Sequence, residues 1–200
     1  MTTPTPPAKD PANPVGRDEV VAAALSAAAE LFAERGVSAT SIRDIAARSK
    51  VNHGLIYRHF GTKEQLVGAV LDHLGTRLTT LLDNGGPADE IELNMDRHMR
   101  VMARALLDGY PIGQLQTRFP GVTRLLDEVL PRFDDERAGR LAVANAVALK
   151  LGWRFFEPFL RSSAGLDPIS DGEVRNAVGA EVARILEPGA AADQSAAAAD

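Results

Sequence analysis

Hydrophobic residues in the first third of the chain recur at every third or fourth position, which is the spacing of an amphipathic helix. The apolar positions of the longest such segment are Val21, Leu25, Ala28 and Phe32. This pattern predicts a helix over residues 18–35, ended by Gly36, because glycine readily takes the left-handed conformation at a helix terminus. Two shorter apolar segments follow at 42–46 and 52–59, and Val51 between them closes a tight turn. These two segments have the spacing of a helix-turn-helix.

Polar residues mark where the helices of this region begin. Thr40 or Ser41 can cap the first short helix by accepting a hydrogen bond from one of its free backbone N–H groups, and Asn52 can cap the second. Thr62 and Gln65 have the spacing of a capping box, in which each side chain accepts a hydrogen bond from the other residue's backbone. This box predicts that a fourth helix begins directly after Thr62.

The remainder of the chain keeps a helical pattern and lacks the alternation that is typical of strands, so the predicted fold class is all-α. The fourth helix is predicted to end at about Leu82, because Asn-Gly-Gly-Pro at 84–87 breaks the chain. The next helix has an apolar stripe that consists of Ile91, Met95, His98, Met102 and Leu106. A loop around Pro111 and a short helix over 121–130 follow.

A long helix is predicted over residues 134–160, ended near Pro158 and Gly165, and it is apolar on more than one face. A capping box at Ser170 opens the last helix, which also has an apolar stripe. A helix that is apolar around most of its girth must be covered on most sides. Two such helices from each of two chains would form a four-helix bundle, so we expect an isologous homodimer.

Composition limits the class of protein. The 200 residues, 45% of them hydrophobic, are enough for a folded core, and the absence of cysteine excludes disulfides and thiolate metal sites. We find no signal peptide and no apolar run long enough to span a bilayer, so we expect a cytoplasmic protein without a membrane partner. Proline-rich residues 1–15 and alanine-rich residues 188–200 are predicted to be disordered tails.

The sequence carries no motif of a known catalytic centre. It has no Walker loop, no G-x-S-x-G and no H-E-x-x-H, and its four histidines are scattered. Its acidic residues are spread over predicted helix surfaces, where solvation explains them. We therefore expect neither an enzyme nor a bound cofactor or metal.

Charge is distributed unevenly along the chain. The whole chain has a formal net charge of −5, but residues 36–63 carry five positive side chains against one negative. The positive side chains of this segment are Arg43, Arg48, Lys50, Arg58 and Lys63. A local basic patch on an acidic protein is typical of a surface that binds phosphate.

The basic patch and the helix-turn-helix together predict binding to double-stranded DNA, with the helix over 52–59 in the major groove. The residues expected to contact phosphates are Thr40, Ser41, Arg43, Tyr57 and Lys63. The residues expected to read bases, at the start of that helix, are Asn52, His53, Gly54 and Leu55. Arg58 and His59 complete the predicted interface. Tyr57 could instead pack on the first helix, and His59 could form a local hydrogen bond.

Two residues of this segment are unusual for their positions. Lys50 occupies the turn, where glycine is common, and a positive φ there would cost lysine about 1 kcal/mol relative to glycine. Gly54 lies inside the predicted reading helix, where glycine is less favourable than alanine by about 1 kcal/mol. Gly54 would let the backbone approach DNA, but it leaves one side chain fewer to read a base.

The segments FAERGVSATSIRDIA and GLIYRHFGTKEQLVGAVL resemble the N-terminal domain of the TetR family of transcriptional regulators over about residues 17–74. The resemblance implies a helix-turn-helix domain over 16–63 and a helical effector-binding and dimerisation domain over 64–187. It also implies a homodimeric repressor on a palindromic operator, released when a small apolar ligand shifts the helix over 63–82. Alternatives are an activator, a regulator that needs no ligand, or a helical small-molecule carrier that does not bind DNA.

Candidates for contact with such a ligand lie in the second predicted domain. They are Met95, His98, Met99, Met102, Trp153 and Phe156. Methionine adapts to varied apolar ligands, although at helical spacing each of these residues could equally belong to the core. His98 could be a hydrogen-bonded core histidine, and it has no metal-ligand residue four positions later.

Overall fold

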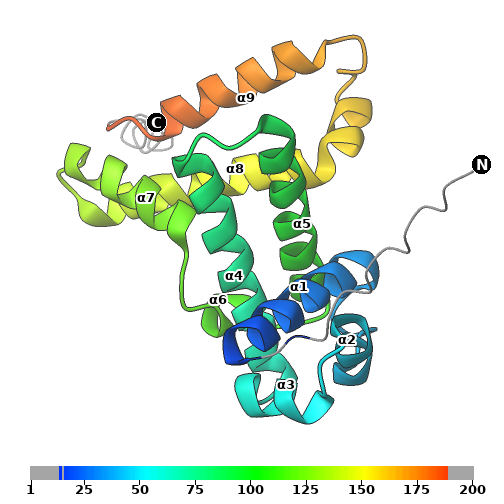
Figure 1. Cartoon of the computed structure of the whole chain (residues 1–200). Helices are drawn as coiled ribbons and strands as arrows, with labels where there is room; N and C mark the ends of the chain where they lie inside the picture. Colours follow the sequence, from blue (N-terminus) through cyan, green and yellow to red (C-terminus); the bar gives the residue numbers. More distant parts are fainter. Residues whose placement is uncertain (1–13, 15, 189–200) are drawn as a thin grey trace, which may run out of the picture. The chain divides into compact units, whose positions relative to one another are not determined.

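The computed structural model describes residue 14 and residues 16–188, and every regular element within them is a helix (Figure 1). The chain divides into two compact units, one ending at Phe119 and the other beginning at Pro120. The predicted all-α fold class is confirmed. The predicted tails, 1–15 and 188–200, lie outside the described residues except for Pro14 and Pro188. Among the described helices, none combines the length and apolarity needed to cross a membrane.

The described residues of the first unit form six helices. They are α1 (Arg17–Arg35), α2 (Ile42–Ser49), α3 (His53–Phe60), α4 (Lys63–Asp83), α5 (Ala88–Leu107) and α6 (Ile112–Leu115). Helix α1 contacts α2, α3, α4 and α5, so it lies at the centre of this unit. Its Phe32 is fully buried together with Ile45 of α2, Ile56 of α3 and Leu66 of α4. Burying each of these side chains stabilises the fold by about 1.5–3 kcal/mol, which holds the helix-turn-helix on α1.

Local capping explains where the short helices begin and end. Ser41, not Thr40, caps α2, and it forms a capping box with Asp44. The amide oxygen of Asn52 accepts a hydrogen bond from the Gly54 N–H and caps α3. The predicted box of Thr62 and Gln65 opens α4. Helix α2 ends at Lys50, whose φ of 56° confirms that the turn needs a left-handed residue.

Helices α4 and α5 lie side by side (Figure 1), and α6 packs on α4. Gly68 is the reason that α6 can approach so closely, because a Cβ there would lie 2.2 Å from the carbonyl oxygen of Leu115. One turn later, the Asp72 carboxylate accepts hydrogen bonds from the backbone N–H groups of Thr117 and Arg118. The segment that ends the first unit is thus fixed to α4.

The buried line of α5 differs from the predicted stripe. The fully buried positions are Asn94, Val101 and Ala105, whereas Leu106, which we expected to be buried, is 54% exposed. The inward face is therefore rotated, and Asn94 is tolerated there because its amide donates to the Glu90 carbonyl oxygen at 2.8 Å. Apolar spacing alone did not reveal this rotation, because the predicted apolar stripe and the observed buried positions lie on adjacent faces of α5.

The second unit is built around its longest helix. Its elements are α7 (Pro120–Val129), the 3₁₀ helix η1 (Leu130–Arg132), α8 (Glu136–Ser163) and α9 (Asp171–Ile185). Helices α7 and α9 both pack on α8. Helix α8 continues through Pro158 to Ser163, so the part of the prediction that placed its end near Gly165, whose φ is 68°, is confirmed and the part that placed it near Pro158 is wrong. Proline frees the carbonyl four residues earlier, at Arg154, but both residues are exposed, so water can satisfy that carbonyl.

Candidate nucleic-acid interface

Helix α3 presents one side to the protein and the opposite side to solvent. Ile56 is 1% exposed and points inward, where α3 contacts α1 and α4. Phe60, one turn later, packs against the same core. The residues on the other side, Gly54 and Arg58, are exposed. The exposed side of α3 is therefore accessible to a partner as large as a DNA duplex.

The start of α3 corrects part of the predicted set of base readers. Asn52 uses its amide oxygen to cap the helix at 2.8 Å from the Gly54 nitrogen, so that oxygen is not free for a base. His53 and Gly54 are exposed, as a reading role requires. Leu55 is turned toward the start of α1, where it lines a cavity. All four residues that we expected to read bases are exposed, although the Asn52 amide oxygen is used for the cap and Leu55 also lines that cavity, so base reading by them stays a prediction.

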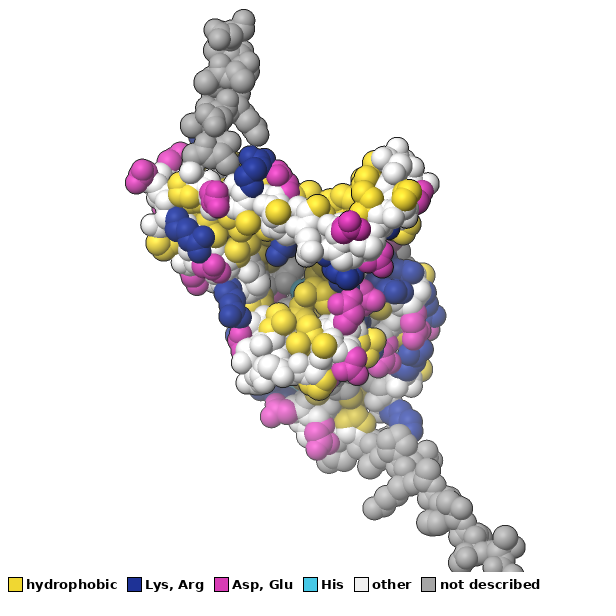
Figure 2. Space-filling view, turned by 90° about the horizontal axis from the view of Figure 1, so that it is seen from above, with side chains coloured by type: hydrophobic (Ala, Val, Ile, Leu, Met, Phe, Trp, Pro, Cys, Tyr) yellow, Lys and Arg dark blue, Asp and Glu magenta, His cyan; other side chains and the backbone are white. Residues whose placement is uncertain are grey.

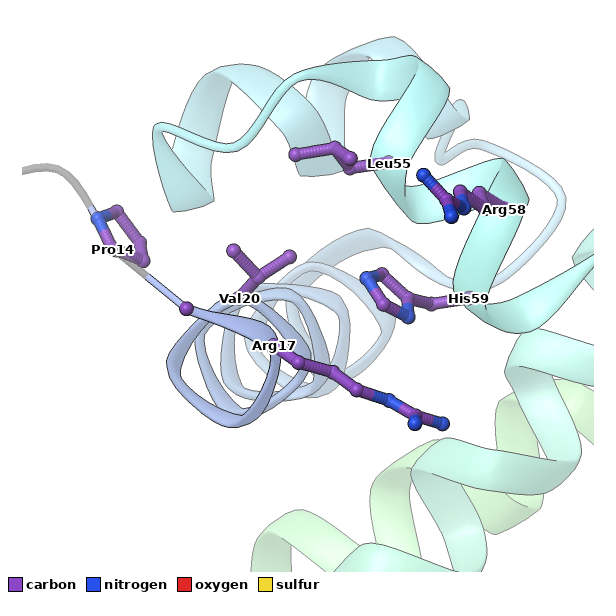
Figure 3. A pocket seen from close by; sticks show the side chains of 7 residues that line it. Pro14, Arg17, Val20, Leu55, Arg58 and His59 are labelled. Carbon is purple, nitrogen blue, oxygen red and sulfur yellow. The ribbon is translucent and has the colours of Figure 1, made fainter.

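The cavity beside α3 has a volume of about 630 Å³ (Figure 3). The residues that line it are Pro14, Gly16, Arg17, Val20, Leu55, Arg58 and His59. His59 extends from α3 toward α1, and Val20 projects from α1 toward α3. His59 is half-buried, and its ring meets the edge of the Phe60 ring. The cavity has three basic or titratable side chains and no acidic one in its lining.

Tyr57 lies on the outer surface of α3. Its side chain is 66% exposed, so the alternative that it packs on α1 is wrong. An exposed phenol can donate a hydrogen bond to a phosphate oxygen. Lys63 begins α4 close by in the sequence, and the free N–H groups of the first helical turn favour an anion there.

The two hydroxyls before α2 are already engaged. Thr40 is buried and donates to the Gly36 carbonyl oxygen at 2.8 Å, so our prediction that Thr40 contacts phosphate is wrong. Ser41 is exposed, but its hydroxyl donates to the Asp44 carboxylate at 2.7 Å. Hydrogen bonds from the Ser41 backbone and hydroxyl lower the pKa of Asp44. Ser41 therefore shapes α2 and has no second proton to offer to a phosphate.

Ion pairs reduce the predicted basic patch. Arg48 lies 3.3 Å from Glu30 and 3.2 Å from Glu34, both on α1, and its hydrogen bond lowers the pKa of Glu34. Arg48 thus joins α2 to α1 and is not a free cation. Arg35 likewise pairs with Asp44 at 2.9 Å. Within the described residues, the other four cations of the patch have no ion-pair partner; they are Arg43, Lys50, Arg58 and Lys63.

Arg17 is a cation of this surface that sequence reasoning missed. It begins α1, lines the cavity beside α3, and has no ion pair among the described residues. A positive charge in the first turn opposes the helix dipole and needs another reason to be there. That unfavourable placement is the signal in the sequence that could have identified it.

The six candidates for ligand contact fall into the two units. Met95, His98, Met99 and Met102 lie on α5 and are half-buried, whereas Trp153 and Phe156 lie on α8. The cavity beside α3 is lined by other residues. The Nδ1 atom of His98 is buried without a hydrogen-bond partner among the described residues, and burial lowers the His98 pKa. The alternative of a hydrogen-bonded core histidine therefore has no support at Nδ1.

Comparison with known proteins agrees with the geometry. The family model for bacterial regulatory proteins of the tetR family matches residues 24–70, which include α2 and α3. The HTH-type transcriptional repressor Rv3405c of Mycobacterium tuberculosis (strain ATCC 25618 / H37Rv) is 67% identical over 175 residues, which cover 88% of this chain and 93% of that protein. The chain belongs to the tetR family of bacterial regulatory proteins. It is a helix-turn-helix transcriptional repressor of this family.

Two further known proteins match less closely. The HTH-type transcriptional repressor KstR2 of Rhodococcus jostii (strain RHA1) is 44% identical over 66 residues, which cover 33% of this chain and 31% of that protein. A crystal structure of NalD, the secondary repressor of the MexAB-OprM multidrug efflux pump in Pseudomonas aeruginosa, has a TM-score of 0.43 at 24% identity. That comparison covers 78% of this chain and 91% of NalD.

Proposed function

We propose that this tetR-family regulator is a homodimeric repressor that binds a palindromic operator in double-stranded DNA, in the cytoplasm. The observation that carries the proposal is the outer surface of α3, where exposed residues and unpaired cations adjoin one another. The names of the relatives as repressors support the direction of regulation. One short helix reads only a few base pairs, so two copies on a two-fold axis are needed for a specific site.

Phosphate contacts would hold the helix-turn-helix domain, residues 16–63, on the duplex. The side chains that we assign to this role are Arg17, Arg43, Tyr57 and Lys63. Each is at least partly exposed, and the three cations are free of ion pairs within the described residues. Such contacts set the position and orientation of the protein but carry little sequence information.

Dimerisation is proposed to use α8 and α9 in the effector-binding and dimerisation domain, residues 64–187. The buried positions of α8 all lie in its first half, whereas Phe156 and Phe159 in its second half are 58% and 68% exposed. Figure 2 shows hydrophobic side chains gathered at the surface of the molecule alongside charged ones. Large exposed phenylalanines are typical of a surface that a partner covers, and a second copy is the partner that DNA reading requires.

An apolar small molecule is proposed to release the repressor from DNA. Half-buried methionines and the unpartnered His98 Nδ1 on α5 support a ligand that combines an apolar body with one polar group. Helix α5 packs on α4, which begins next to the reading helix, so a shift of α4 would move α3. A coupling of about 1–3 kcal/mol between ligand and DNA is enough for strong induction. An activator or a regulator without a ligand would share the same interface.

The proposal is tested by binding of the full-length protein to a palindromic duplex and to a duplex of random sequence over a range of salt concentrations. The expected result is a steep loss of affinity with salt on both duplexes, and a preference of at least ~1000-fold for one palindrome. Lys63→Ala should weaken binding to both duplexes to a similar extent. A protein that stays bound to neither duplex at low salt would instead be the helical carrier that the sequence left open.

A further inference from the structure

We infer that Arg58 is the main base-reading residue of α3 and that it selects a guanine in each half-site. The inference rests on the proposed function, because it assumes that α3 enters the major groove of an operator. It moves the centre of base recognition from the start of α3, where the sequence indicated it, to the second turn. The argument combines the phase of the helix, the absence of a side chain at Gly54, and the state of each nearby cation.

The phase of α3 directs Arg58 outward. Successive residues of an α-helix are rotated by about 100°, so Arg58 lies about 200° around the axis from Ile56. Ile56 is fully buried and Phe60 packs against the same core, which fixes the inward direction. Arg58 therefore lies on the side of α3 opposite the core and is exposed, and its side chain also lines the edge of the cavity beside α1. His53 and Tyr57 lie nearer one flank of the helix, and Leu55 and His59 lie on the other flank beside α1.

Gly54 leaves space for the Arg58 side chain. Long side chains on a helix tend to lean back over the preceding turn, so Arg58 can extend over the residue four positions earlier, which is Gly54. A Cβ at Gly54 would meet only the Asn52 amide oxygen, at 3.2 Å, and is otherwise in open space. The glycine thus lets the guanidinium lie close to the helix backbone at the bottom of a groove. This explains a residue that otherwise only weakens the helix.

The charge of Arg58 is available for recognition. Two other arginines near the helix-turn-helix are engaged, Arg35 with Asp44 and Arg48 with Glu30 and Glu34. Arg58 has no ion pair within the described part of the chain. Its planar guanidinium donates two parallel hydrogen bonds, which match the O6 and N7 acceptors of guanine in the major groove. No other base pair offers two acceptors to one such fork.

The test begins with selection of full-length protein on duplexes whose two half-sites are randomised symmetrically. The wild type should select one guanine per half-site, and Arg58→Ala should lose the preference at that position while the preferences at other positions remain. Replacing that guanine by 7-deazaguanine, which lacks the N7 acceptor, should weaken wild-type binding by about 5- to 150-fold, the range of one bidentate contact. The same replacement should leave the binding of Arg58→Ala unchanged.

Matched controls separate base reading from phosphate contact. Inosine keeps O6 and N7 and lacks only the minor-groove amino group, so it should not change wild-type binding. Arg58→Lys keeps the charge and can still donate to O6 and N7 without the planar fork, so it should keep the affinity for random duplex and retain part of the guanine preference. Lys63→Ala should weaken all duplexes alike. Because Arg58 is exposed, its variants should unfold at the wild-type temperature.

The inference is overturned if Arg58→Ala weakens every duplex to the same extent and lowers the salt dependence by about one phosphate contact, because Arg58 would then hold the backbone. It is also overturned if 7-deazaguanine weakens the wild type and Arg58→Ala equally. Both results leave specific palindrome binding intact. Failure of the proposed function is a different result, in which the wild type selects no sequence at all.

Discussion

Replacement of Lys50 by glycine is predicted to stabilise the protein. Lys50 ends α2 with φ of 56° and ψ of 26°, and among the described residues no other non-glycine residue has a positive φ. A Cβ in this left-handed conformation costs about 1–2 kcal/mol. Glycine avoids that cost, although its more mobile unfolded chain takes back about 0.4–1 kcal/mol. The net gain of about 0.5–1 kcal/mol corresponds to a rise of about 1–4 °C in Tm for a chain of this size.

The measurement is thermal unfolding followed by circular dichroism, at one protein concentration because a dimer's Tm depends on concentration. Lys50→Ala is the matched control, since it removes the same charge and keeps the Cβ. We expect Lys50→Gly to unfold at a higher temperature than both the wild type and Lys50→Ala. Affinity for DNA should change equally in the two variants. If both variants had the same Tm, the strain at this turn would not be the reason for the effect.

Three further predictions follow from packing, titration and assembly. A methyl group at Gly68 would lie 2.2 Å from a backbone oxygen of α6, so Gly68→Ala should destabilise by about 1–3 kcal/mol in denaturant unfolding, whereas Gly152→Ala, in open space, should not. Burial lowers the His98 pKa below 6.5, so as the pH falls His98 is protonated in the unfolded chain at a higher pH than in the folded chain. The free energy of unfolding therefore decreases as the pH falls below about 6.5. His98→Leu should reduce this loss, and an equal loss in the variant would refute the assignment. Phe159→Asp should give a monomer in analytical ultracentrifugation, whereas Leu107→Asp, at a more exposed site on α5, should remain dimeric.

Features set by neighbouring residues could be predicted from the sequence. The capping boxes at Thr62 and Ser170 lie where the sequence indicates, because both partners are three residues apart and form before any tertiary contact. The helix-turn-helix is similarly local, and Gly36 ends α1 with its N–H bonded to the Phe32 carbonyl oxygen. The left-handed turn at Lys50 followed from the same reasoning. In these cases a few adjacent side chains decide the backbone.

Features that depend on long-range packing could not be predicted. Thr40 looks like an exposed phosphate donor, but folding buries it and joins its hydroxyl to Gly36. Arg48 looks like a free cation, but its partners Glu30 and Glu34 come from α1, 18 and 14 residues earlier. Proline tends to end a helix, but α8 continues through Pro158 because this position is exposed and water can satisfy the carbonyl that the proline frees. Each correction needs the position of a residue that sequence spacing does not provide.

The most direct test of paired reading helices is the affinity of the full-length protein for its selected palindrome before and after insertion of about five base pairs at the centre. Such an insertion rotates one half-site by about half a helical turn, so a two-fold dimer can no longer place both α3 helices in major grooves on one face of the duplex. We predict a loss of at least ~100-fold, toward the affinity for random DNA. An unchanged affinity would contradict the account, because each chain would then bind its half-site alone.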